Sequence, residues 1–170
     1  MMTRSDYCQF LVSSINNYTL TYLGEHSPEF SHDQARRLLN NNKYPPRLVW
    51  EKVESQLVLS PQGIIAFDDT VLDKNYSKSI ETVRRQFSGN AKAIIRGIGV
   101  VTCVYVNPET NQFWIIDYRL FSPETDGRTK LEHVEEMLRN AHFAKELPFR
   151  TVLMDTWLSL IHISEPTRPY

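Results

Sequence analysis

Residues 63 to 157 contain four strand-like apolar runs and one amphipathic helix, in an order that few folds can accommodate. The runs GIIAFDDT, IGVVTCVYV and FWIIDYRLF read as three strands, and NPETNQ between the last two is typical of a hairpin connection. The stretch RTKLEHVEEMLRNAHFAKEL then predicts a helix, and RTVLMDTW predicts a fourth strand. A meander of three strands followed by a helical crossover places the fourth strand beside the first and parallel to it.

Two elements of this region carry detailed expectations. In the predicted third strand, alternation places Trp114, Ile116, Tyr118 and Leu120 on one face and Asp117 and Arg119 on the other, where these two charges would form a surface ion pair. The predicted helix begins with the capping-box pair Thr129 and Glu132. Its apolar stripe consists of Leu131, Val134, Leu138 and Ala141.

Residues 1 to 62 form a helical N-terminal region. Ser31 is an expected N-cap with Gln34 three residues later, and Ala35, Leu38 and Leu39 follow as an apolar stripe. A second helix restarts at Pro46, which suits a first helical turn, with Leu48, Val49, Val53 and Leu57 facing inward. Two short helices across a proline-marked turn allow two interpretations, a DNA-binding module or a packed helical hairpin.

Two of the apolar runs lead directly into aspartates. Asp68 and Asp69 follow IIAF, and Asp155 follows VLM. If the first and fourth strands are parallel neighbours, Asp69 and Asp155 meet at one site, where carboxylates suit Mg²⁺ or Mn²⁺ and two such ions would support phosphodiester cleavage. Aspartates after strands also make ordinary turn and cap hydrogen bonds, which is the alternative. Alternation points Asp68 to the opposite side, as a solvated acid or a partner of the ligands.

A locally basic segment follows the first strand. It contains Lys74, Lys78, Arg84, Arg85, Lys92 and Arg96 against Glu81 alone. Such a segment is where a DNA-cutting protein would contact phosphates, whereas the alternative is a solvated helix over KSIETVRRQF with Ile80, Val83 and Phe87 packed. Tyr76, Phe87 and Trp157 could stack on a displaced base, although aromatic residues beside a core usually pack.

The overall composition gives no global signal for DNA or membrane. The chain has 19 basic and 20 acidic residues, so any nucleic-acid contact depends on local charge. Cys8 and Cys103 lie far apart and are expected to be reduced thiols. Because no segment resembles a signal peptide or a membrane span, we expect a soluble cytoplasmic protein without a membrane partner.

Four ordered blocks carry a family resemblance. The stretches DDTVLDKNYSKSIETV, FSGNAKAIIRGIGVVT, DYRLFSPETDGRTKLEHVEEML and VLMDTW resemble the DDE transposases of bacterial insertion sequences, which have an RNase H-like catalytic core. The similarity covers about Gly63 to Trp157, and the preceding helices resemble the family's N-terminal region. It implies an α/β fold with a partial RNase H-like core, catalytic metal ligands at Asp69 and Asp155, and Mg²⁺ or Mn²⁺ as the cofactor. The implied partner is double-stranded DNA, both transposon ends and target, and the intact protein could be a homodimer.

The end of the chain departs from this family. Residues 158 to 170 read LSLIHISEPTRPY, of which Leu158 to Arg168 resemble a translated sequencing adapter, so His162 and Glu165 are not expected to be ligands. The third acidic residue of the DDE set, a Glu on a later helix, has no match after Asp155. The sequence therefore predicts a truncated and inactive transposase, with domains at 1–62, 63–157 and a non-native 158–170. The alternatives are a DNA-binding fragment without chemistry, and an RNase H-like nuclease unrelated to transposition.

Overall fold

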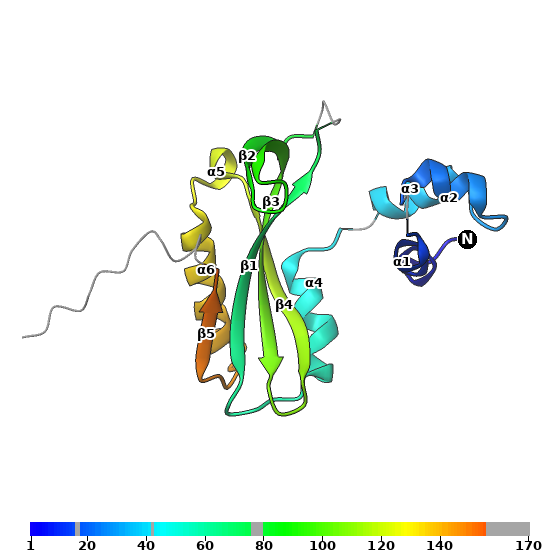
Figure 1. Cartoon of the computed structure of the whole chain (residues 1–170). Helices are drawn as coiled ribbons and strands as arrows, with labels where there is room; N and C mark the ends of the chain where they lie inside the picture. The colour runs from blue at the N-terminus through cyan, green and yellow to red at the C-terminus, as the bar shows by residue number, and fades with distance from the viewer. Residues whose placement is uncertain (16–17, 42, 76–79, 156–170) are drawn as a thin grey trace, which may run out of the picture. The chain divides into compact units, whose positions relative to one another are not determined.

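A computed structural model describes residues 1–15, 18–41, 43–75 and 80–155 (Figure 1). The chain divides into two compact units, Met1–Pro45 and the part from Pro46 onward. This division separates the two helices of the predicted N-terminal module, because the first belongs to the first unit and the second packs on the sheet of the second unit. The division of function at residue 62 stays a prediction.

The first unit consists of three short helices. They are α1 (Arg4–Ser13), α2 (Leu20–His26) and α3 (His32–Asn41). The predicted capping box of α3 is confirmed, since Ser31 Oγ accepts from the Gln34 amide at 3.3 Å and Gln34 Oε1 accepts from the Ser31 amide at 3.1 Å. Met2, Leu23 and Ala35 form the buried cluster of this unit.

The second unit is built on a five-stranded mixed sheet. Its strands are β1 (Ile64–Asp73), β2 (Arg84–Ser88), β3 (Ala93–Asn107), β4 (Gln112–Phe121) and β5 (Thr151–Met154). The strand order is β2-β3-β1-β5, and β4 pairs with β3. β1 pairs antiparallel with β3 and parallel with β5, so the predicted neighbourhood of the first and last strands is confirmed. The mixed α/β architecture also agrees with the predicted partial RNase H-like core.

Strand β2 was not expected. Its residues were interpreted as part of a solvated helix, but Arg84–Ser88 pair antiparallel with Ala93–Gly97 of β3. The helical interpretation fails for these residues because the backbone hydrogen bonds go to a neighbouring strand, a tertiary contact that overrides the local helical pattern. Tyr76 and Lys78 lie outside the described residues.

Strand β1 does not end at the paired aspartates. It runs to Asp73, with Asp68 opposite Thr102 and Asp69 opposite Val101 in the β3 ladder. Two acids can occupy a strand interior here because alternation separates their side chains by face. Asp69 lies on the side of Val101, which is fully buried, whereas Asp68 is exposed.

The predicted faces of β4 are wrong because the strand contains a β-bulge. The register with β3 shifts between Cys103 and Val104, so Asp117 pairs with Cys103 and Ile115 pairs with Val104. Ile116 is the extra residue, and Ile116 and Asp117 are both buried, at 0% and 4% exposure. Asp117 and Arg119 therefore lie on the buried side of the strand with Ile116. The prediction that they form a surface ion pair is wrong, because the pair is largely buried.

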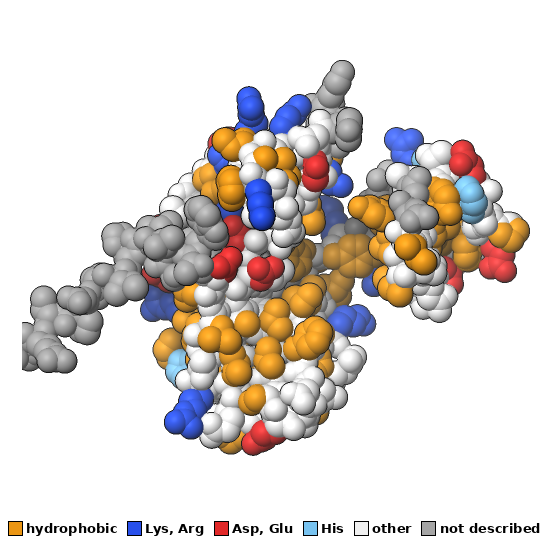
Figure 2. All heavy atoms as spheres, viewed as in Figure 1, with side chains coloured by type: hydrophobic (Ala, Val, Ile, Leu, Met, Phe, Trp, Pro, Cys, Tyr) orange, Lys and Arg blue, Asp and Glu red, His pale blue; other side chains and the backbone are white. Residues whose placement is uncertain are grey.

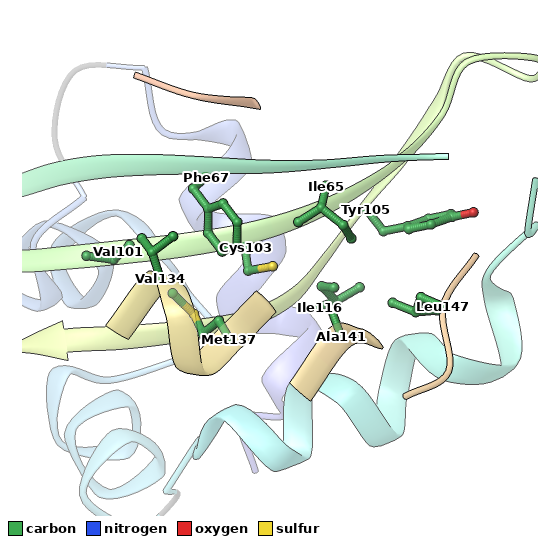
Figure 3. Close-up of a cluster of buried hydrophobic side chains, with 10 residues drawn as sticks. All are labelled: Ile65, Phe67, Val101, Cys103, Tyr105, Ile116, Val134, Met137, Ala141 and Leu147. Atoms are coloured by element: carbon green, nitrogen blue, oxygen red, sulfur yellow. The ribbon is translucent and has the colours of Figure 1, made fainter. Parts of the chain in front are cut away.

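Two helices cover the same face of the sheet. They are α4 (Pro46–Val53) and α6 (Lys130–Arg139), and both pack against one cluster of buried side chains (Figures 1 and 3). The cluster takes Ile65 and Phe67 from β1 and Val134, Met137 and Ala141 from α6 and the turn after it. Trp50, Val53 and Leu57 pack at its edge. The predicted Thr129–Glu132 capping box is present at the start of α6.

The opposite face of the sheet is bare within the described residues. The large side chains that it exposes include four from β4 and β5: Phe113 is 71% exposed, Leu153 is 52%, Ile115 is 47% and Leu120 is 45%. Figure 2 views this face, and hydrophobic side chains lie together over the strands. These side chains form a patch and are not isolated apolar residues. In this part of the chain the described residues make two layers, the sheet and the helices on its covered face.

The remaining sequence expectations concern thiols and membranes. Cys8 is exposed and Cys103 is buried, and both are free. Burial, with a smaller contribution from Asp117, raises the pKa of the Cys103 thiol to about 12, so this thiol stays protonated. Within the described ranges, no helix combines the length and apolar character of a transmembrane span.

Candidate active site

Asp69 and Asp155 line the same cavity, although they are far apart in the sequence. The cavity has a volume of about 460 Å³ and lies beside the middle of β1, the ends of β2, β4 and β5, and the start of α6. The parallel pairing of β1 and β5 produces this meeting, because Phe67 is in register with Met154 and the two aspartates follow these residues. The other lining residues are Gln86, Phe87, Gly89, Phe121, Pro123, Gly127, Arg128, Thr129, Lys130 and Leu131.

Asp69 is held by a lysine that the sequence did not single out. Lys130 Nζ lies 2.5 Å from Asp69 Oδ2, and the two side chains are 23% and 18% exposed. The other carboxylate oxygen, Asp69 Oδ1, is buried and has no hydrogen-bond partner among the residues that the structure describes. A buried oxygen without a donor is costly unless a cation or water satisfies it, so this oxygen is a ready ligand position.

Asp155 is exposed and follows the last residue of β5. It reaches the cavity from the strand next to β1, as the topology predicted. Its neighbour Trp157 lies outside the described residues, as do His162 and Glu165. The structure therefore brings together the two acids selected from the sequence, and it places both at a cavity rather than in the core.

Asp68 has a different environment from Asp69. Its Oδ2 accepts a hydrogen bond from the Thr70 hydroxyl at 2.9 Å, and it does not line the cavity. The two acids lie on opposite faces of β1, as alternation predicted. Asp68 is therefore a solvated acid in this structure.

The predicted basic segment does not supply the cations of the cavity. Arg84 is ion-paired with Glu124 at 3.4 Å and its guanidinium lies over the Phe121 ring at 5.2 Å, so it is engaged in packing around the cavity. Arg85 and Arg96 lie opposite each other across the β2–β3 ladder and are exposed, like Lys74 and Lys92. Figure 2 shows Lys and Arg side chains gathered at the end of the unit that carries β2.

The cations that do line the cavity are Arg128 and Lys130. They flank Thr129, the N-cap of α6, and Gly127 precedes them with a φ of 69°, a left-handed conformation that glycine adopts without strain. The sequence signal was the stretch GRTK before the apolar stripe of the helix. It was interpreted only as a cap, because nothing in the local pattern reveals that β1 lies beside it.

A chain of ion pairs leads from the cavity to the buried part of β4. Arg128 contacts Glu136, Glu136 lies 3.4 Å from Arg119, and Arg119 contacts Asp117. Lys145 completes the chain at 3.4 Å from Asp117. Because the Lys145 and Asp117 side chains are only 10% and 5% exposed, this pair is buried and each charge depends on the other.

The carboxylates fit a divalent cation in part. Asp69 and Asp155 supply oxygen donors, which Mg²⁺ and Mn²⁺ prefer, and the unpartnered Asp69 Oδ1 provides an open position. No group of three or more His, Cys, Asp or Glu side chains that could hold a metal occurs among the described residues. The site therefore offers two acidic ligands.

This combination defines a class of protein. A mixed sheet in which neighbouring parallel strands bring two acids to one cavity is the arrangement of RNase H-like enzymes that cut nucleic acids. The sequence profile described as DDE superfamily endonuclease matches residues 5–159, and the chain belongs to this family. It is a DDE-type, transposase-like protein. Its family acts on DNA and generally uses divalent metal ions. A comparison with curated proteins gives no match.

Proposed function

We propose that the chain is the DNA-cutting part of an insertion-sequence transposase, with Asp69 and Asp155 as the ligands of Mg²⁺ or Mn²⁺. The bound ions would lower the pKa of an attacking water or 3′-hydroxyl and stabilise charge on the phosphodiester. The intact protein would cut at the ends of its element and join the freed 3′-hydroxyl to target DNA, both double-stranded. A protein with this role in a bacterium would act in the cytoplasm and could work as a homodimer.

One observation carries the proposal: Asp69 and Asp155 line one cavity although only tertiary structure connects them. Two aspartates that only made local turn or helix-cap hydrogen bonds would not be expected to line the same cavity. Among the described residues, the side-chain hydrogen bond of Asp69 comes from the distant Lys130 and not from a neighbour in a turn or cap, and its Oδ1 has no donor. Asp68, one residue earlier, shows the alternative, since it accepts from the nearby Thr70 hydroxyl.

Exposed basic side chains near the cavity would contact the DNA backbone. Lys74, Arg85, Lys92 and Arg96 are exposed around β2 and the start of β3, and Arg128 and Lys130 line the cavity itself. Phosphate contacts of this kind position DNA without reading its sequence. Arg84 is the least suited of the predicted set, because its charge is already used by Glu124 and Phe121.

The test is divalent-dependent nicking of plasmid DNA. The assay uses a version of the protein that carries the third acidic residue of the DDE set. Asp69→Asn and Asp155→Asn should each reduce nicking by at least about a hundredfold, the scale of a lost electrostatic contact to a transition state. Asp68→Asn is the matched control and should retain activity. Equal nicking by all variants would remove the two acids from the mechanism.

A second candidate is a DNA-binding module without chemistry. The exposed cations around β2 favour it, since they need no metal to contact phosphates. Duplex binding that falls steeply with salt, and is indifferent to Mg²⁺ and to Asp69→Asn, would support this candidate against the first. An RNase H-like nuclease unrelated to transposition would instead cut without preference for element ends.

A further inference from the structure

Lys130 occupies a position that local helix energetics disfavour. It is the first residue of α6, where the helix dipole favours acidic side chains and disfavours cations. Arg128, another cation, lies two residues before it. The capping box at the start of α6 does not involve the lysine: Thr129 Oγ1 accepts from the Glu132 amide, and the acidic side chain of Glu132 accepts from the Thr129 amide. The reason for a lysine here therefore lies outside the helix.

The reason is the contact with Asp69, 61 positions earlier in the chain. Lys130 Nζ donates to Asp69 Oδ2 at 2.5 Å and also lies 5.1 Å from the centre of the Phe121 ring. Both contacts favour a cation, the first by charge and the second through the ring electrons. The ammonium is thus held between a carboxylate and an aromatic ring on the wall of the cavity.

The pair leaves Asp69 only half satisfied. Oδ2 has the ammonium, but Oδ1 is buried without a partner. A divalent cation at this carboxylate would carry more charge than the ammonium, and two cations at one partly buried carboxylate repel each other strongly. Metal entry at Asp69 and the present position of Lys130 are therefore in competition.

We propose that Lys130 is an internal counter-ion of Asp69 that the divalent cation must displace, and that the displaced ammonium then pairs with a DNA phosphate in the same cavity. The proposal rests on the proposed function, since it assumes that Asp69 is a metal ligand. Without metal, the lysine neutralises a partly buried carboxylate that would otherwise lack a cationic partner. With metal, its long and flexible side chain moves its charge from Asp69 to the substrate.

The first test is a Mn²⁺ titration of the full chain, followed by the electron paramagnetic resonance of free Mn²⁺. Lys130→Met keeps the length of the side chain and removes the competing charge, so Mn²⁺ should bind about tenfold more tightly than to the wild type. Lys130→Arg keeps the charge and should not tighten binding. Lys52→Met, on the exposed side of α4, is the matched control and should change nothing. Unchanged or weaker binding by Lys130→Met would overturn the proposal.

Asp69→Asn separates this failure from a failure of the proposed function. If Asp69→Asn weakens Mn²⁺ binding while Lys130→Met does not tighten it, Asp69 is a ligand but the lysine does not compete. If Asp69→Asn leaves binding unchanged, the metal site itself is wrong, and the lysine proposal falls with it. Lys130→Gln serves if Lys130→Met does not fold, and thermal unfolding with and without Mn²⁺ should show a larger metal-induced stabilisation in either neutral variant than in the wild type.

The second test concerns the displaced ammonium. Binding of a short DNA duplex is measured over a range of salt concentrations, with Mn²⁺ and with chelator. In Mn²⁺, Lys130→Met should lower the slope of log affinity against log salt by about one, the signature of one lost phosphate contact. In chelator, the slope should match the wild type, because the lysine is then engaged by Asp69. An equal loss in both conditions, or none in Mn²⁺, would overturn the transfer of the lysine to DNA.

Discussion

The two faces of the sheet in the second unit use the same residue types in opposite ways. The face under α4 and α6 carries the buried cluster and two acids, Asp69 and Asp117, each paired with a lysine. The bare face carries exposed isoleucine, leucine and phenylalanine side chains and Asp68, which contacts only a hydroxyl and solvent among the partners described for it. The covering helices therefore decide whether an aspartate is a charge-paired group or a solvated one.

The two acids of the covered face also differ from each other. Asp117 is enclosed by Arg119 and Lys145 and is 4% exposed, so its role is to hold the charge network of β4 and α6 together. Asp69 lies at the cavity and keeps one oxygen without a partner. A buried acid with all its partners is structural, whereas a partly buried acid with an open oxygen at a cavity is a candidate ligand.

The largest expected difference between the faces concerns two neighbouring isoleucines at the bulge. Ile116 is 0% exposed and belongs to the buried cluster, whereas Ile115 is 47% exposed on the bare face. Ile116→Ala should lower the free energy of unfolding by about 4 kcal/mol, through lost burial and a cavity. Ile115→Ala should lower it by at most about 1 kcal/mol. Denaturant unfolding measures both, and similar losses would mean that something covers the bare face.

Removing the buried charge of Asp117 should have the next largest effect. Asp117→Asn leaves Arg119 and Lys145 without their carboxylate, and breaking such a pair should reduce stability by about 3 kcal/mol. Asp68→Asn makes the same chemical change on the bare face and should alter stability by less than about 1 kcal/mol. Urea unfolding curves of the two variants test the contrast, which fails if Asp117→Asn is as stable as the wild type.

A smaller effect is expected from one hydroxyl on the covered face. Tyr105 is fully buried, and its hydroxyl accepts from the Ser60 amide at 3.0 Å and lies 3.1 Å from the Pro148 carbonyl. Tyr105→Phe leaves these groups without a partner and should reduce stability by about 1 to 2 kcal/mol, with no change in the fold. Thermal unfolding with unchanged circular dichroism would agree, and an unchanged melting temperature would show that solvent replaces the hydroxyl.

The smallest effect is a pH dependence from His133, a buried residue of α6. Burial lowers the pKa of His133 from the ordinary 6.5. Asp126, whose Oδ2 lies 3.3 Å from His133 Nε2, raises the pKa but offsets only part of this decrease. The unfolded chain therefore takes up a proton at a higher pH than the folded chain, so stability decreases as the pH falls below about 6.5. Between pH 7.5 and pH 5.5, the free energy of unfolding of His133→Gln should therefore decrease less than that of the wild type. Identical slopes would contradict the assignment.

Much of the second unit could be predicted from sequence because its signals are local. Alternation and turn residues indicated β1, β3 and β4, and the capping pair Thr129 and Glu132 marked the start of α6. Strand β2 was missed because its residues follow no clean alternation and are ordered by pairing with β3. The bulge at Ile116 was missed because one extra residue changes the face of everything after it and leaves no mark in composition.

The sequence by itself determined the order of the main elements and the family, and it selected Asp69 and Asp155 as candidate ligands, because periodicity, capping and motif spacing are properties of neighbouring residues. Only the tertiary structure decided that Lys130 holds Asp69, that Asp117 is buried with Lys145, and that one face of the sheet is bare. These facts depend on which distant segments meet. The stability of such tertiary contacts depends on burial and on charges that lie across the sheet from one another, and a local sequence pattern does not contain this information.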